Sequence, residues 1–300
     1  MLAALWRKLF LEERPSIGLS LFRPFAAFTV AAHILPTFVR LDDNYLPTAF
    51  KEKNFSFFTP NILQWVEQSP DALVKTMVVV LCLSVFLFGI GLFSRVSCIA
   101  MTLCCYYFYA LNSLHIGTLS YDILLVTLFL LCVTPYPGDS LSVDCRLRTD
   151  SWTATRVRPI FVQRLLQMQV SSTFFYTALC KVSASGNWLT DNPIFYLLNS
   201  TSESVVKQFP FRHFFAARPE LCFWIGVGII CFEFSLSVLI WWKKTRDLYI
   251  FAGFLFHVML VVTLHVPTIF FFLFPPQLFL FVEPEKVEGF FRKFRRTRRL

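Results

Sequence analysis

Apolar residues run along this chain in stretches about as long as a membrane-crossing helix, separated by shorter polar segments. About twenty apolar residues in a helix cross the hydrocarbon core of a bilayer. Eight stretches are candidates: residues 18–39, 74–93, 96–114, 119–133, 159–180, 221–242, 248–264 and 267–282. The pattern predicts an all-α fold, a multi-pass transmembrane helical bundle of about eight spans. The last stretch is interrupted by Pro267, Pro275 and Pro276.

Two segments between the predicted spans are long enough to hold further structure. Residues 40–73 and 182–220 combine prolines, aromatic residues and short amphipathic runs. Irregular backbone at membrane depth occurs only where it is buried in protein or lines a water-filled cavity. We therefore expect short interfacial or re-entrant helices in these outer loops, such as residues 193–199, capping a cavity between the spans. The expected domains are a bundle over residues 1–285 and a basic cytoplasmic tail over residues 286–300.

Composition supports a membrane setting. Hydrophobic residues make up 56% of the 300 positions and charged residues only 16%, with a mean hydropathy of +0.58. A soluble domain would carry about a quarter charged residues. The chain is therefore expected to be an integral membrane protein with the lipid bilayer as its main partner.

The positive charges predict the orientation. With eight spans both termini lie on one side, and most of the 28 Lys and Arg residues fall on that side. The positive-inside rule then places the termini in the cytoplasm and the end of the 159–180 span on the outward side. We interpret the basic run FFRKFRRTRRL at residues 290–300 as an anionic-lipid contact, and we expect no nucleic-acid partner.

The span over residues 159–180 is unusually polar for a bilayer helix. It contains Gln163, Gln167 and Gln169, and it is followed directly by Lys181. An ionised side chain at mid-membrane costs roughly 2.5–3.5 kcal/mol. Either this helix faces protein and water on one side, or Lys181 reaches the headgroups. A lysine held in an apolar pocket can act as a neutral base, whereas a solvated one does not. The sequence leaves both open.

Other polar residues also fall within the predicted spans. Asp122 and Glu233 are candidates to neutralise Arg23 or Lys181. The alternative is that such groups only tie helices together, because lipid gives helices no hydrophobic reason to associate. His257 and His265 are eight residues apart, which is unsuitable for a metal pair, so no metal site is expected.

The order of several landmarks resembles a known family. They are LSLFRP at residues 19–24, GIGLFSR at 89–95, LSYDILLVTLFLLCVTPYPGDSLSVD at 119–144, the glutamine-rich span ending in Lys181, then Trp188, Glu233 and His257. The series is similar to the HTTM domain, a multi-pass membrane module shared with vitamin K-dependent gamma-carboxylases. The resemblance covers most of the chain.

The resemblance implies a chemistry. In the carboxylases a lysine of this region is the base that deprotonates vitamin K hydroquinone, so the resemblance makes Lys181 the candidate base. Asp122, Glu233 and His257 become candidate supporting groups, and a quinone similar to vitamin K becomes the candidate cofactor. Near the start of the fourth span the carboxylases have a functional histidine, where this chain has Tyr121 and Asp122.

Three hypotheses follow, and the sequence does not decide whether the protein is an enzyme. The first is a membrane enzyme of the gamma-carboxylase-like family acting on a quinol or lipid-like substrate in an outward-facing cavity. The second is a non-catalytic membrane partner in the maturation or export of a secreted peptide or protein. The third is a structural membrane subunit.

Overall fold

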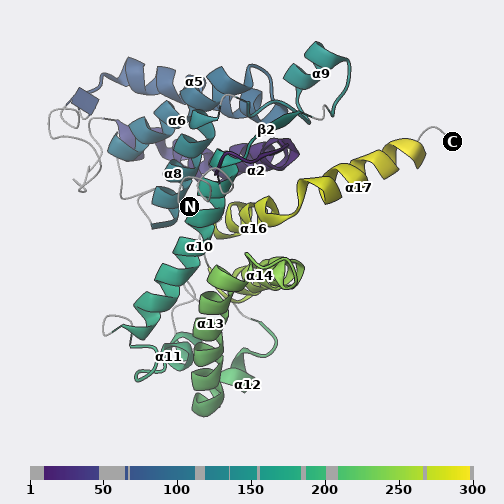
Figure 1. Cartoon of the computed structure of the whole chain (residues 1–300). Coiled ribbons are helices and arrows are strands. Elements are labelled where there is room, and N and C mark those ends of the chain that lie inside the picture. The colour runs from purple at the N-terminus through teal and green to yellow at the C-terminus, as the bar shows by residue number, and fades with distance from the viewer. Residues whose placement is uncertain are drawn as a thin grey trace. The chain divides into compact units, whose positions relative to one another are not determined.

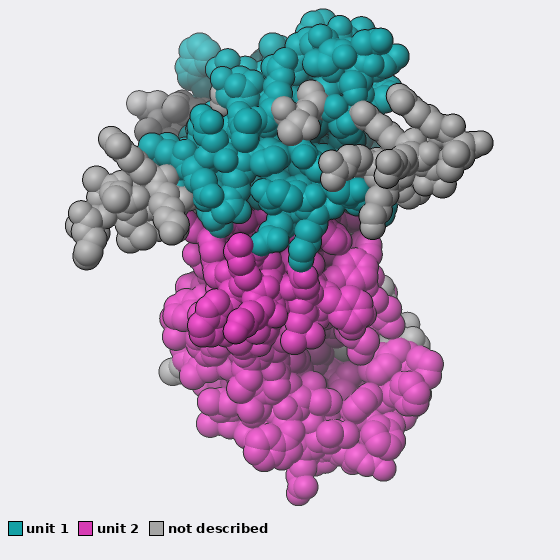
Figure 2. Space-filling model, turned by 45° about the vertical axis from the view of Figure 1, so that its right-hand side comes forward, with its two compact units in different colours: residues 1–166, 283–300 teal, residues 167–282 magenta. Residues whose placement is uncertain are grey.

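The computed structural model describes residues 10–46, 65–66, 68–111, 119–134, 136–153, 156–183, 187–200, 209–265 and 269–297, and these are mostly helical. The chain divides into two compact units, distinguished by colour in Figure 2. Unit 1 comprises residues 1–166 and 283–300, and unit 2 comprises residues 167–282. The first division falls inside helix α10 (Phe161–Val182).

Unit 1 is built around four apolar helices (Figure 1). In chain order it contains β1 (Glu13–Pro15), α2 (Ile17–Ile34), η1 (Leu35–Arg40), α3 (Leu41–Tyr45), α5 (Asp71–Ile90), α6 (Ser94–Leu111), α8 (Leu119–Val133), α9 (Val143–Thr149), β2 (Val157–Pro159), the start of α10, and α17 (Pro284–Thr297). Helix α5 packs against both α2 and α6, and α6 packs against α8.

A two-stranded antiparallel sheet was not predicted from the sequence. Strands β1 and β2 pair with Arg14 opposite Arg158. Strands of three residues are too short to show an alternating pattern, so periodicity gave no signal for them. Their pairing brings the start of the chain to the segment that leads into α10.

A tight turn joins α5 to α6. Gly91 ends α5 in the left-handed conformation, at φ +74°, and its N–H donates to the carbonyls of Leu87 and Phe88. Glycine is the residue that adopts this conformation at little cost. The turn has no room for a side chain either, because a Cβ at this position would lie 2.4 Å from Arg23 Nη1.

Unit 2 contains the rest of α10, α11 (Pro193–Asn199), α12 (Arg212–Ala216), α13 (Pro219–Leu239), α14 (Arg246–Thr263), α15 (Ile269–Phe272), α16 (Phe274–Leu278) and η2 (Phe279–Phe281). One apolar core joins helices α10, α13, α14 and α16, through residues that include Phe174, Leu236, Ile250 and Leu278. A smaller core packs Leu198 of α11 against Cys222 of α13.

Several helices expose apolar side chains at helical spacing. On α5 they are Val79, Leu83, Phe86 and Ile90; on α14 they are Leu248, Phe251, Leu255, Met259 and Val262. Steps of three and four residues place each set on one face of its helix. A continuous exposed apolar face on a long helix is what a lipid-facing surface requires.

The predicted spans compare with the observed helices as follows. Four helical segments are long and apolar enough to cross a membrane: Ile17–Tyr45, Asp71–Ile90, Pro219–Leu239 and Arg246–Thr263. A shorter apolar helix covers Tyr121–Val133. The predicted stretch at residues 267–282 is not one helix but α15, α16 and η2. Pro275 and Pro276 lack the N–H that continues a helix and stand in the first turn of α16.

The structure describes only part of the two predicted outer segments. The short helix predicted at residues 193–199 is present as α11. Most of residues 40–73, together with residues 184–186 and 201–208, lies outside the described residues. Helix α17 runs across the predicted boundary between residues 285 and 286, which stays a prediction.

Candidate functional site

The direction of the Lys181 side chain at the end of α10 follows from how the preceding residues of this helix pack. Val170, Phe174 and Ala178 are buried at spacings of four residues and place one face of α10 against protein. Lys181 comes seven residues, or nearly two turns, after Phe174 and therefore lies on the same face. Helix α10 thus directs its only lysine toward the interior of unit 2.

Lys181 forms an ion pair with Glu233 of α13. The Lys181 Nζ donates to both carboxylate oxygens, at 2.8 Å to Oε1 and 2.7 Å to Oε2. It lies 3.4 Å from the carbonyl oxygen of Thr177, one turn earlier in α10. The two side chains are 18% and 6% exposed, so most of the pair is withdrawn from solvent. Buried charges persist where they are paired in this way.

An aromatic ring lies beside the ion pair. The Lys181 Nζ is 5.3 Å from the centre of the Trp188 ring, within the range of a cation–π contact. The Trp188 backbone N–H donates to the Lys181 carbonyl at 3.2 Å, which fixes the tryptophan just beyond the end of α10. Lys181, Glu233 and Trp188 therefore form one cluster, called here the Lys181 cluster.

His257 of α14 lies on the same side of α10 at a different level. It is 3% exposed, and neither ring nitrogen has a hydrogen-bond partner among the described residues. Its ring stacks on Phe274, with centroids 5.5 Å apart, and meets the edge of Phe174 at 5.9 Å. Phe174 precedes Lys181 by about 10.5 Å along the helix axis. His257 and Glu233 therefore pack against one face of α10 two turns apart.

Asp122 has tyrosine neighbours within its own unit. It lies in α8 of unit 1, beside Tyr106 and Tyr109 of α6, whereas Lys181, Glu233 and His257 belong to unit 2. A carboxylate next to tyrosines fits the alternative that some polar groups only tie neighbouring helices together.

Arg23 has a different set of partners from the one expected. Its side chain is 1% exposed, and no described acid forms an ion pair with it. The guanidinium donates to three backbone carbonyls: Leu141 at 2.7 Å, Gly89 at 3.4 Å and Pro137 at 3.4 Å. Asp122 and Glu233 were proposed as partners of Arg23 or Lys181, and it is Lys181 that pairs with Glu233. The donors of Arg23 go instead to a carbonyl at the end of α5 and to two carbonyls of the loop between α8 and α9.

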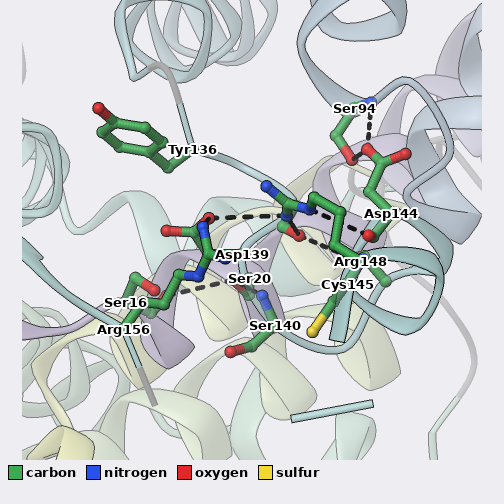
Figure 3. A network of polar contacts seen from close by, with 12 residues as sticks. Ser16, Ser20, Ser94, Tyr136, Asp139, Ser140, Asp144, Cys145, Arg148 and Arg156 are labelled. Carbon is green, nitrogen blue, oxygen red and sulfur yellow. Dashed lines mark hydrogen bonds and ion pairs between the residues drawn. The ribbon is translucent and has the colours of Figure 1, made fainter. Parts of the chain in front are cut away.

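Asp139 is the centre of a polar network that sequence reasoning missed (Figure 3). It is 1% exposed and lies 2.9 Å from Arg158, 3.7 Å from Arg148 and 3.9 Å from Arg156. The hydrogen bond to Asp139 raises the pKa of Arg158 above its usual value. The Arg158 guanidinium also lies 3.5 Å above the centre of the Tyr136 ring.

Asp144 belongs to the same stretch of chain. Its carboxylate accepts from the backbone N–H groups of Phe93 and Ser94, at 2.9 and 2.8 Å, and from the Ser94 hydroxyl at 2.6 Å. Helix N-termini leave such donors unsatisfied, and Asp144 caps the start of α6 (Figure 3). Sequence signals for the network existed in the PGDSLSVD segment and the five arginines that follow it within residues 146–164.

Comparison with known protein families identifies a family for this chain. Residues 13–285 match the family model of the HTTM domain. The chain belongs to the HTTM-domain family. No curated protein and no solved structure matches it. Together with the four helical segments that are long and apolar enough to cross a membrane, this membership makes the chain an integral membrane protein.

Within this HTTM protein, the described residues contain no group of three or more His, Cys, Asp or Glu placed to hold a metal ion. His257 is enclosed by phenylalanine rings, and His265 lies beyond the end of α14 at residue 263. The chemistry available in the Lys181 cluster is proton transfer between an amine and a carboxylate, next to the face of an aromatic ring.

Proposed function

We propose that this HTTM protein is a multi-pass membrane enzyme that acts on a quinol or lipid-like substrate in an outward-facing cavity, with Lys181 as the base. The observation that carries the proposal is the ion pair between Lys181 and Glu233, held against Trp188 at the end of α10. An isolated charge inside a membrane protein is costly, and ionisable residues kept there are usually paired with one another and mark functional sites.

The proposed topology has about eight spans, with both termini in the cytoplasm. In support, α10 exposes Met168, Phe175, Leu179 and Val182 while its opposite face is buried. This amphipathic division suits a helix with lipid on one side and protein on the other, although its glutamines lower its hydropathy. The basic residues of the tail at 286–300 support the cytoplasmic assignment. Short helices such as α11 would lie at the interface.

One proton transfer within the Lys181 cluster would convert Lys181 into a base. As paired, Lys181 is an ammonium and Glu233 a carboxylate. Moving one proton from Nζ to the carboxylate across 2.7 Å gives a neutral amine and a carboxylic acid. The amine can then accept the proton of an acidic hydroxyl, leaving an oxyanion beside the ammonium that forms. Glu233 would act as the proton relay and Trp188 as a face for a flat ring.

The residues present are suitable for a quinone. His257 has two unpartnered ring nitrogens, and one of them is able to donate to a quinol oxygen. Phe174 and Phe274 line the same imidazole, and Trp188 offers a second aromatic surface. A bound quinol would supply the acidic hydroxyl and the electrons of the reaction. Asp122, in unit 1, is not assigned a part in this chemistry.

Quinone content tests the binding part of the proposal. We expect the purified protein to carry a co-purifying quinone, detected by mass spectrometry of its lipid extract, and Lys181→Ala to lose most of it. Lys75→Ala is the matched control, because Lys75 is an exposed lysine of α5 in the other unit. Equal quinone content in all three proteins, with an unchanged phenotype of the host, would contradict the enzymatic proposal and favour a non-catalytic partner in peptide maturation or export.

A further inference from the structure

A second polar site lies in unit 1, in a pocket of about 370 Å³. Its lining comes from the α5–α6 turn and first turn of α6 (residues 93–96), the loop at residues 136–139, and α9 (residues 144, 147 and 148). Asp144 ties two of these segments together, because it caps the start of α6 from α9. The Lys181 cluster has no residue in this pocket.

Positive charge exceeds negative charge around the pocket. Asp139 is one carboxylate facing three guanidinium groups, so it neutralises only one of them. Asp144 is occupied by the three donors at the start of α6. The lining residue Arg95 is exposed and has no hydrogen bond or ion pair to a described residue. Two guanidinium groups of the lining and two more beside Asp139 therefore outnumber the two carboxylates, and Arg95 has no acid partner among the described residues.

Arg148 is positioned to contribute donors as well. Its Nε donates to the Asp144 carbonyl and its Nη2 to the Gly138 carbonyl, both at 3.0 Å. These bonds fix the guanidinium at the pocket wall and leave its Nη1 donors without a bond to a described residue. Arginine guanidinium groups bind phosphate through pairs of parallel N–H donors, and Arg95 and Arg148 place two such groups at this pocket.

The rim of the pocket is apolar. Phe93, Val96 and Leu147 line the pocket and are largely exposed. From Val96 the exposed apolar face continues along α6 through Ile99 and Leu103, at spacings of three and four residues. Tyr136, also in the lining, is an aromatic residue of the kind enriched at membrane–water interfaces.

We propose that this pocket binds the phosphate headgroup of an anionic phospholipid, with the acyl chains lying along the exposed face of α6. The charged lining takes the headgroup, and the rim and the stripe Val96–Ile99–Leu103 take the chains. A free phosphate ion would use the same arginines, but it would leave the apolar rim and stripe without a partner. The lipid therefore accounts for both features.

Lipid retention tests the proposal with the full-length protein. Nanodiscs of phosphatidylcholine mixed with phosphatidylglycerol are dissolved gently, and the phospholipid that stays with the protein is measured by mass spectrometry. We expect retained phosphatidylglycerol to exceed phosphatidylcholine, and Arg95→Gln to weaken its binding about tenfold. Arg40→Gln is the control, because Arg40 is also exposed in unit 1 but does not line the pocket.

Further measurements distinguish a bound phospholipid from a bound phosphate ion and check that the Arg95→Gln variant is folded. Leu147→Ser should lower phosphatidylglycerol retention, and inorganic phosphate should fail to displace the lipid. Thermal unfolding should be the same for the wild-type protein and Arg95→Gln. Equal retention of both lipids, equal loss in Arg95→Gln and Arg40→Gln, or displacement by inorganic phosphate would overturn the assignment of a phospholipid site.

Discussion

Replacing Glu233 by Gln tests whether the Lys181 ion pair is formed and what it contributes to stability. The substitution keeps the shape of the side chain and a hydrogen-bond acceptor but removes the negative charge. Breaking a fully buried pair costs about 3–5 kcal/mol. Because Lys181 is 18% exposed, part of its charge is solvated in the variant, and the loss is expected to be smaller, about 2 kcal/mol.

The assay is thermal unfolding of the purified protein in detergent, followed by tryptophan fluorescence. A loss of about 2 kcal/mol lowers the midpoint by roughly 4–8 °C for a domain of 150–250 residues. Glu220→Gln is the matched control, because Glu220 is exposed in the first turn of the same helix. It should leave the midpoint nearly unchanged.

A double-mutant cycle completes the test. In Lys181→Gln together with Glu233→Gln no charge is left without a partner, so the double variant should be more stable than the sum of the two single losses indicates. Additive losses, or a Glu233→Gln midpoint equal to that of Glu220→Gln, would refute the interaction between these two side chains.

Two further predictions concern unit 1. Gly91→Ala should destabilise the protein by more than about 2 kcal/mol, since it places a side chain at φ +74° and against the Arg23 guanidinium. Its control is Gly228→Ala in α13 of unit 2, where a Cβ meets nothing within 4 Å; this change should be neutral or slightly stabilising in the same thermal assay. Asp139→Asn should cost about 1–3 kcal/mol because three arginines lose their carboxylate. Asp150→Asn, at a side chain 93% exposed, should change the stability by less than about 0.5 kcal/mol in urea or thermal unfolding.

The helices were largely predictable from the sequence because they depend on local patterns. Residues 119–133 were predicted as a helix and form α8 with the same bounds. Hydrophobic length and helix spacing are properties of neighbouring residues, so they can be read along the chain. The stretch at residues 267–282 failed as a single helix for an equally local reason, its prolines.

Polar contacts could be predicted from the sequence only where a side chain has few possible partners. Glu233 was one of two acids proposed for Lys181, and it is the one that pairs with it. Arg23 was the other candidate partner of these acids, and it instead binds a carbonyl at the end of α5 and carbonyls of the loop between α8 and α9. Every residue has a carbonyl, so nothing in the sequence marks the particular ones that a folded loop brings to an arginine.

The same limit explains the missed network around Asp139. Its partners lie between nine and nineteen residues away and are brought together by a loop, a short helix and a strand. No periodic pattern encodes such contacts. The short pairing of β1 with β2, which places Arg158 opposite Arg14, was equally outside the reach of sequence reasoning.

Quinol oxidation by Lys181→Arg tests the central proposal most directly. Arginine keeps the positive charge that Glu233 requires, but its guanidinium does not give up a proton, so it preserves the ion pair and removes the base. With phylloquinol and oxygen as reactants, giving the quinone and hydrogen peroxide, oxygen uptake is recorded with an electrode. We predict a wild-type rate above background and a rate at least about 10²-fold lower in a stably folded Lys181→Arg protein. A wild-type protein with no such rate, or a Lys181→Arg protein with the wild-type rate, would contradict the assignment of Lys181 as the base.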